Sequence, residues 1–322
     1  MTYRLLRDES VEEAVGRIAR EQLREALRDF GDEQLDDAEI VHQVRKRCKK
    51  VRGLLRMVRQ ALGDTYAREN AWYRDAARSI SGLRDATALL EAFDALIDRY
   101  EDQVNVQSFA PLRQALAERR HELETALDLS EKMAAFRSAI KQGKKRVKTW
   151  RLSQRGFKAV AGGIGVTYRR ARRGMSRARG EPSVANLHEW RKRVKYHWYH
   201  MRLLRPVWPA LYQVRRGAAK NLSDLLGDDH DLHMLAQTLV SEPQRFGDAA
   251  AQAPVLALID LRRRELQAAA GAIGTRLFAD KTRNWVRQQK RYWKAWRTGH
   301  AVNKPLPHEV MELGVGAMSV QR

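Results

Sequence analysis

Residues 41–59, VHQVRKRCKKVRGLLRMVR, carry two residue patterns that share one rhythm. Apolar residues recur at spacings of three and four, as on the buried face of an α-helix; they are Val41, Val44, Cys48, Val51, Leu55 and Val58. One position along, the same rhythm selects His42, Arg45, Lys49, Arg52, Arg56 and Arg59, with Lys46 beside them. We call the apolar set the seam and the second set the stripe. A disordered basic tail has no reason to keep both registers, so this segment is predicted to be a helix.

Both registers occur again 146 positions later, in LHEWRKRVKYHWYHMRLLR, residues 187–205. Seven of the nineteen aligned positions are identical. The second seam is Leu187, Trp190, Val194, His197, Met201 and Leu204. The second stripe is His188, Arg191, Lys195, Trp198, Arg202 and Arg205, with Lys192 adjacent. The same offset pairs further residues, among them Arg24 with Arg170, Arg74 with Lys220, Asp85 with Asp231, and Leu89 with Leu235. One constant offset over this length predicts an internal duplication.

Helical spacing continues through most of the chain, and no segment alternates as a strand would. The predicted helices cover 10–30, 37–61, 65–101, 106–128, 130–150, 153–178, 183–205, 209–240, 253–273 and 279–298. Ser10 followed by two glutamates indicates the start of the first helix. We therefore expect an all-α protein with one domain over 9–298, made of two pseudo-symmetric bundles (9–150 and 151–298) around a basic groove or channel. Residues 299–322 are expected to form a loose tail.

Charge narrows the class of partner. The 322 residues include 61 Lys and Arg against 39 Asp and Glu, a net charge of +22, while 43% hydrophobic residues and eight Trp argue against disorder. The electrostatic field of so large a positive charge attracts polyanions, and the candidates are nucleic acid, an anionic membrane and polyphosphate. Like charges one turn apart destabilise a helix by a few tenths of a kcal/mol per pair. Either acidic residues on neighbouring helices or an external polyanion must therefore offset the repulsion between the cations of each stripe.

Four classes of protein are not expected. A single cysteine, Cys48, excludes a disulfide framework and a zinc site built on cysteines. The first fifteen residues carry acids where a signal peptide has an apolar run, and no apolar run approaches the length of a membrane span. We expect a cytoplasmic protein without membrane insertion. The aromatics in RNWVRQQKRYWKAWR (283–297) are expected to anchor a terminal helix, with base stacking as the alternative.

The paired helices, each with the pattern H-x-x-R-[KR]-x-x-[KR], resemble those of the CHAD domain family. Each is followed by a segment with a short acidic signature, ISGLRDATALL (80–90) and LLGDDHDLHML (225–235). The resemblance implies two four-helix bundles around a basic groove that binds inorganic polyphosphate, and an association with polyphosphate granules. Carried over by position, the ligands would be His42, Arg45, Lys46, Lys49, Arg52, Arg56, His188, Arg191, Lys192, Lys195 and Arg202, with Arg24, Arg74, Arg170 and Lys220 as secondary candidates. Trp198 stands where the first copy has Arg52, which predicts a weaker or differently shaped second wall.

Catalysis is not expected. Asp228 to Asp231 with His233 looks like a metal cluster, but on one helix these side chains would point in different directions. Asp85 and Asp231 are expected to orient cations or cap the backbone instead. The chain lacks the E-x-E-x-K motif of the triphosphatase domain that is fused to some relatives, and it lacks a glycine-rich phosphate loop. We expect no metal and no cofactor. The alternatives are a sequence-independent nucleic-acid binder and a phosphohydrolase acting on polyphosphate.

Overall fold

The computed structural model describes residues 3–80, 82–126 and 129–299, and within these ranges every regular element is a helix. The helices are α1 (Val11–Asp29), α2 (Asp37–Met57), α3 (Asp64–Arg78), α4 (Gly82–Arg99), α5 (Ala110–Ala126), α6 (Leu129–Arg146), α7 (Gly156–Gly180), α8 (Val184–Leu204), α9 (Pro209–Ser241), α10 (Pro243–Phe246), α11 (Ala249–Leu277) and α12 (Thr282–Thr298). Four 3-10 turns lie at Glu101–Gln103 (η1), Val106–Phe109 (η2), Val147–Thr149 (η3) and Arg205–Val207 (η4). The all-α prediction is confirmed. The expected tail, apart from Gly299, lies outside the described residues.

Helix starts follow the expected capping chemistry. The side chain of Ser10 accepts a hydrogen bond from the backbone of Glu13, whose carboxylate accepts one from the backbone of Ser10. Asp36 and Glu39 form the same reciprocal pair at the start of α2. These boxes satisfy backbone donors that the first turn leaves unpaired, so α1 and α2 begin where the sequence predicts.

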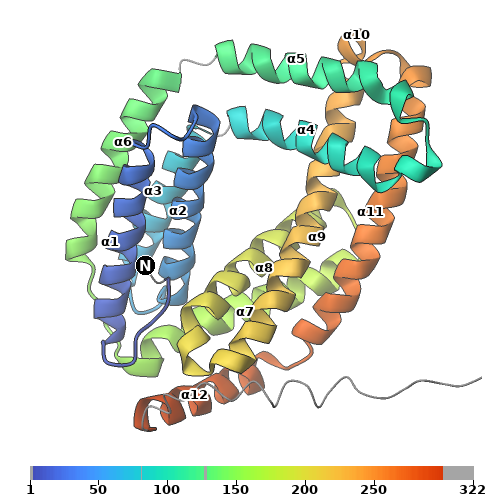
Figure 1. Ribbon diagram of the computed structural model, residues 1–322. Coiled ribbons are helices and arrows are strands. Elements are labelled where there is room, and N and C mark those ends of the chain that lie inside the picture. Colours follow the sequence, from blue (N-terminus) through green and yellow to red (C-terminus); the bar gives the residue numbers. More distant parts are fainter. Residues whose placement is uncertain (1–2, 81, 127–128, 300–322) are drawn as a thin grey trace, which may run out of the picture.

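One predicted helix is wrong. The sequence pattern suggests one continuous helix over 65–101, but α3 ends at Arg78 and α4 begins at Gly82. α3 packs beside α2 and α6, whereas α4 runs from their upper end towards α9 (Figure 1). The corresponding prediction for 209–240 is confirmed, because α9 is one helix over Pro209–Ser241.

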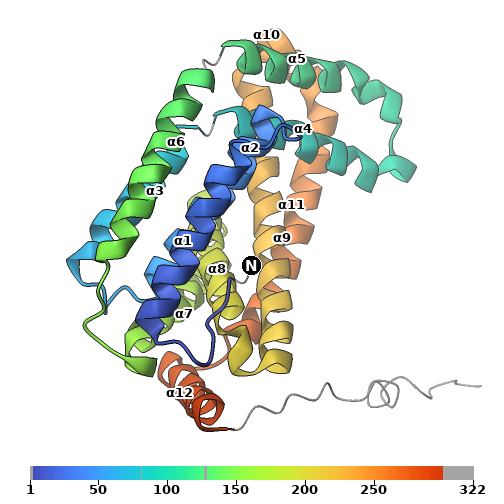
Figure 2. The ribbon, with the colours of Figure 1, turned by 60° about the vertical axis from the view of Figure 1, so that its left-hand side comes forward.

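Two hydrophobic cores hold the helices together, and each draws on both halves of the chain. The larger core joins α1, α2, α3 and α6 to α7, α8, α12 and the first part of α9. The second lies between α4 and α5 of the first half and α9 and α11 of the second half. Figure 2 shows the same arrangement after rotation, with α1, α3 and α6 on one side and α9 and α11 on the other. The halves are therefore interlocked through α4 and α5.

α12 lies across the lower end of α7 and η4 (Figure 1). Trp285 and Trp293 are buried, and the Trp285 ring stacks on Tyr168 of α7 with centres 4.5 Å apart. The expectation that these tryptophans anchor a terminal helix is confirmed. None of the described helices is both long enough and apolar enough to cross a bilayer.

Candidate functional site

Both predicted seams are buried, which fixes the direction of the stripes. All six seam residues of the first copy and all six of the second are buried. α2 therefore turns one face into the bundle of the first half, and α8 turns the equivalent face towards α7 and α9. Because the stripes are rotated away from the seams, they lie on the sides of α2 and α8 that are not inside these cores.

α2 and α8 meet at Gly53, against which the side chain of Tyr199 of α8 packs. A Cβ atom at residue 53 would lie 2.9 Å from the Cβ of Tyr199, closer than carbon atoms ordinarily approach. The Nε2 of His200 hydrogen-bonds the carbonyl oxygen of Gly53 at 3.1 Å. Burial lowers the pKa of His200 to about 3, so its ring is neutral and Nε2 is the donor. This contact brings helices of the two halves side by side.

Arg52 and Arg56 of α2 share one acceptor on α3. The Nε of Arg52 donates to Oδ1 of Asn70 at 3.3 Å, and a guanidinium nitrogen of Arg56 donates to the same oxygen. The Arg56 guanidinium also lies over the ring of Tyr196 on α8, 3.8 Å from its centre. Burial lowers the pKa of Arg56, and the positive charges of Arg52 and of Arg193 on α8 act in the same direction. Arg56 is thus a half-buried cation held by an amide and an aromatic ring.

Lys50 and Arg202 approach one another across Tyr3. The Lys50 amine lies 5.9 Å from the centre of the Tyr3 ring, and the Arg202 guanidinium carbon lies 5.2 Å from it. Burial lowers the pKa of Lys50 to about 8, and Arg47, Arg202 and Lys46 lower it further. Cations of α2 and α8 are therefore close enough to repel each other electrostatically.

Trp198 organises the second stripe. The Lys195 amine lies 4.7 Å from a Trp198 ring centre, and the Arg202 guanidinium carbon lies 5.0 Å from one. Burial lowers the pKa values of both Lys195 and Arg202. A cation over an indole face gains about 0.5 to 2 kcal/mol, depending on how far it is desolvated. The residue that breaks the repeat pattern therefore holds two of the predicted ligands.

His188 faces α9. Its ring lies 4.7 Å from that of His230, centre to centre, and Nδ1 of each ring is buried without a hydrogen-bond partner. Burial lowers the pKa of each imidazole to about 4, and the charge of Arg191 lowers both further. Both rings are neutral at pH 7, so His188 can exchange a hydrogen bond with a ligand but contributes no charge.

The sequence model of the CHAD domain matches residues 13–240. The chain belongs to the CHAD domain family. No curated protein matches the sequence. Both basic helices, and the cations that meet between them, lie inside the CHAD domain, whereas α11 and α12 lie beyond the match.

The other predicted ligands of the CHAD domain differ in surroundings. His42, Lys46 and Lys49 are exposed, and Arg45 is half-buried. The Lys192 amine pairs with Glu189 at 2.6 Å. Of the secondary candidates, Arg24 and Arg170 are exposed, Arg74 pairs with Asp75 at 2.7 Å, and Lys220 pairs with Asp224 at 2.5 Å. Arg170 has a pKa lowered by burial, then by Arg193 and Arg59. The charges of Arg193 on α8 and of Arg59, two residues after the end of α2, therefore both act on Arg170.

The acidic signature that follows α8, residues 225–235, is hydrogen-bonded to α11. Asp229 is buried and accepts hydrogen bonds from Arg263 at 3.1 Å and from Gln267 at 2.7 Å, both on α11. Across the described chain, no group of three or more His, Cys, Asp or Glu side chains is placed to hold a metal ion. The side chain of Asp85 lies outside the described residues, and Asp231 is half-buried.

Sequence reasoning missed Lys50 and Arg193. Lys50 aligns with Tyr196 in the repeat, so a search for matched cations passes over it. Arg193 aligns with Arg47, but their surroundings differ. Arg47 pairs with Glu25 and Asp29 at 3.8 and 3.2 Å, whereas Arg193 pairs with Glu189 and lies near Arg56. Arginine occupies this aligned position in both copies, and that match was the sequence signal that could have pointed to Arg193.

Proposed function

We propose that this CHAD domain binds inorganic polyphosphate in a basic groove between α2 and α8, without catalysis, and that it associates with polyphosphate granules. One observation carries the proposal: cations of α2 lie beside cations of α8, a helix that repeats its pattern 146 residues later, with Lys50 and Arg202 near the same Tyr3 ring and Arg56 over Tyr196 of α8, and the α8 charges lower the pKa values of Lys50 and Arg56. The pairs are Lys50 with Arg202, and Arg56 with Arg193. The ligands proposed are the eleven residues carried over from the family, joined by Lys50 and Arg193.

Electrostatics favours an external polyanion at this place. Arg56, Lys195 and Arg202 have pKa values lowered chiefly by burial, and the guanidinium groups of Arg56 and Arg202 lie against aromatic rings. Phosphoryl oxygens would offset this repulsion, through paired N–H donors of arginine and through lysine point charges. Binding would also raise the pKa of Lys50 from about 8.

The helix bounds support the proposed duplication. Shifted by 146 positions, α2 covers residues 183–203, and α8 is Val184–Leu204. By the same shift α1 falls on residues 157–175 of α7, and α3 and α4 together fall on 210–245, nearly the span of α9. Two related units that place equivalent stripes face to face would give the groove two basic walls, as we propose.

Polyphosphate is favoured over nucleic acid because the aromatic rings nearest the cations are already engaged. Tyr196 lies under Arg56, and Trp198 lies near both Lys195 and Arg202. Both rings are half-buried, and Tyr3 is buried. Single-stranded nucleic-acid sites stack bases on accessible rings, whereas a polyphosphate chain has no base to stack.

The chemistry at His188 supports binding without catalysis. An efficient general acid or base has a pKa near the working pH, whereas burial lowers that of His188 to about 4. Asp229, a neighbour of the same signature, is committed to Arg263 and Gln267. We infer that His188 positions phosphate by hydrogen bonding.

Competition between polyanions tests the proposal. Labelled long-chain polyphosphate is bound to the protein, and duplex DNA or unlabelled polyphosphate is added at equal phosphate concentration. We expect unlabelled polyphosphate to displace the label at least tenfold more effectively than DNA. Equal or better displacement by DNA would contradict the proposal and favour the nucleic-acid alternative.

A further inference from the structure

The N-terminal residues 3–9, which we call the strap, are fastened to both halves of the chain. The Tyr3 hydroxyl donates to the carbonyl oxygen of Lys50 at 2.8 Å. The Leu5 N–H donates to the carbonyl oxygen of Leu203 at 3.0 Å. Because both bonds reach helices that belong to the larger core, the start of the strap has a fixed position.

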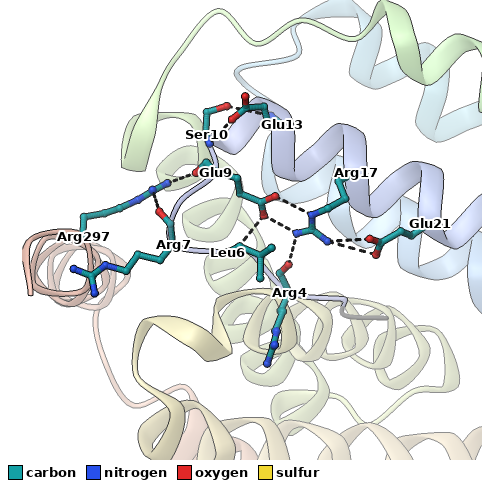
Figure 3. Close-up of polar contacts among 9 residues, drawn as sticks. All are labelled: Arg4, Leu6, Arg7, Glu9, Ser10, Glu13, Arg17, Glu21 and Arg297. Carbon is teal, nitrogen blue, oxygen red and sulfur yellow. Dashed lines mark hydrogen bonds and ion pairs between the residues drawn. The ribbon is translucent and has the colours of Figure 1, made fainter. Parts of the chain in front are cut away.

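Arg17 and Arg297 fasten the rest of the strap (Figure 3). The Arg17 guanidinium donates to both carboxylate oxygens of Glu9, at 2.8 and 2.6 Å, and to the carbonyl oxygen of Arg4 at 2.9 Å. Arg297 of α12 donates to the carbonyl oxygens of Arg7 and Glu9. The Glu9 carboxylate and three carbonyl oxygens of the strap thus accept hydrogen bonds, while the side chains of Arg4 and Arg7 take no part in these bonds.

A cavity of about 590 Å³ lies between the strap, η4, the start of α9 and α12. Its apolar lining is Leu5, Leu6, Pro206, Pro209, Ala210 and Trp296, with Gln213 at the polar side. Its charged lining is Arg4, Arg7 and Arg205, and none of the described residues that line it is acidic. An occupant that suits this cavity has both apolar side chains and negative charge.

The positive charges that line the cavity are not balanced by acidic side chains of the described chain. Within the described chain, the side chains of Arg7 and Arg205 form no ion pair. Hydrogen bonds between a guanidinium and a carboxylate are stronger than neutral ones, so a carboxylate arriving here would be stabilising.

We propose that the chain's own C-terminal segment PLPHEVMELGV, residues 305–315, docks in this cavity. Glu309 and Glu312 are the only acids of the sequence after Gly299, and Leu306, Val310 and Leu313 are interspersed with them. Their carboxylates would pair with Arg4, Arg7 and Arg205, and the apolar side chains would cover the proline and leucine lining. This inference is independent of polyphosphate binding.

The connection is short enough. Trp296 lines the cavity and α12 ends at Thr298, so the segment leaves the helix at the rim. Glu309 lies ten positions beyond Gly299, and ten residues span up to about 35 Å when extended. Tethering at this length gives an effective concentration on the order of millimolar, so even a weak intrinsic affinity would keep the cavity occupied.

A disulfide-trapping experiment on the full chain tests the docking. Cysteines are introduced as A210C with M311C, and the native Cys48 is a quiet background because it is buried. The control pair is G217C with M311C, because residue 217 is exposed on the same helix, about 10 Å further along. Under mild oxidation we expect the first pair to form an intramolecular disulfide at least tenfold faster than the control. Equal rates, or disulfide-linked dimers in place of the intramolecular product, would overturn the proposal.

Charge exchange tests the predicted ion pairs. In the A210C, M311C background, E309R with E312R is expected to reduce trapping to the control rate. Adding R7E with R205E is expected to restore it, with circular dichroism confirming that every variant keeps its helices. Trapping that ignores the first exchange, or that the second exchange fails to restore in a folded protein, contradicts the assignment.

Discussion

His197, in the seam of α8, is a buried histidine that contacts three aromatic rings. Its ring centre lies 5.7, 5.3 and 5.6 Å from those of Tyr168, Phe278 and Trp285. Neither ring nitrogen has a hydrogen-bond partner, and burial lowers the pKa to about 3. In the unfolded chain the ordinary pKa is about 6.5. The unfolded state therefore takes up the proton first as the pH falls, so this residue makes the folded state less stable below pH 6.5.

Replacing His197 by Phe should remove that acid sensitivity. Between pH 7 and pH 5 the wild type is expected to lose about 2 kcal/mol of unfolding free energy through this group, and H197F is expected to keep it. Urea denaturation at the two pH values measures the difference. H121F, at an exposed position of α5, is the control and should behave as the wild type. An equal pH-dependent loss in H197F and wild type would show that His197 titrates normally.

At this scale the sequence predicted burial better than it predicted contacts. The rhythm of residues 41–59 gives the angle of each side chain about the axis of α2, and that angle was sufficient to identify the seam. It cannot show which distant segment covers a side chain. Lys50 is buried partly because Tyr3, 47 residues away, lies against it, and nothing in the local pattern of α2 reports this.

Helix crossings depend on glycine at the points where backbones touch. A Cβ atom at Gly163 of α7 would lie 2.0 Å from the carbonyl oxygen of Met57 and 2.4 Å from that of Arg56, both at the end of α2. A change of side-chain rotamer cannot relieve a clash with backbone atoms. A side chain at residue 163 would therefore force α7 and α2 apart at this crossing. This crossing positions the end of α2, where Arg56 lies, relative to the second half.

Replacement of Gly163 by Ala should therefore destabilise the protein. We expect a loss of about 1 to 3 kcal/mol or more, as in other overpacked cores, although alanine is the better helix former. G217A is the matched control, because no atom lies within 4 Å of a Cβ there, and it should gain up to about 1 kcal/mol. Chemical denaturation followed by circular dichroism compares them. A G163A variant as stable as G217A would disprove the close approach.

The sequence pattern failed to predict the break between α3 and α4. Ile80 joins the larger core, while Leu89 and Phe93 join the second core. The apolar spacing continues across the break, although the residues on its two sides pack in different cores. Periodicity reports that a face is buried but does not report which core buries it.

For the whole molecule, the interlocked cores explain how so many cations can be held together. α4 and α5 of the first half pack on α9 and α11 of the second, and α2 and α8 touch at Gly53. Repulsion between Lys50 and Arg202, or between Arg56 and Arg193, therefore cannot be relieved by separating the halves. The sequence predicted the two stripes, and the family resemblance suggested their ligand. Their closeness follows from long-range packing, which neither pattern contains.

The most direct test is a titration of defined-length polyphosphates at several salt concentrations, using charge-reversal variants. We expect R45E with K49E, and R191E with K195E, each to weaken binding at least tenfold and to flatten the salt dependence, with unchanged helical circular dichroism. R283E with R287E changes the net charge equally on exposed positions of α12 and should have little effect. Binding should tighten with chain length. Equal losses in all three variants would contradict a polyphosphate groove between α2 and α8 and leave only a general response to net charge.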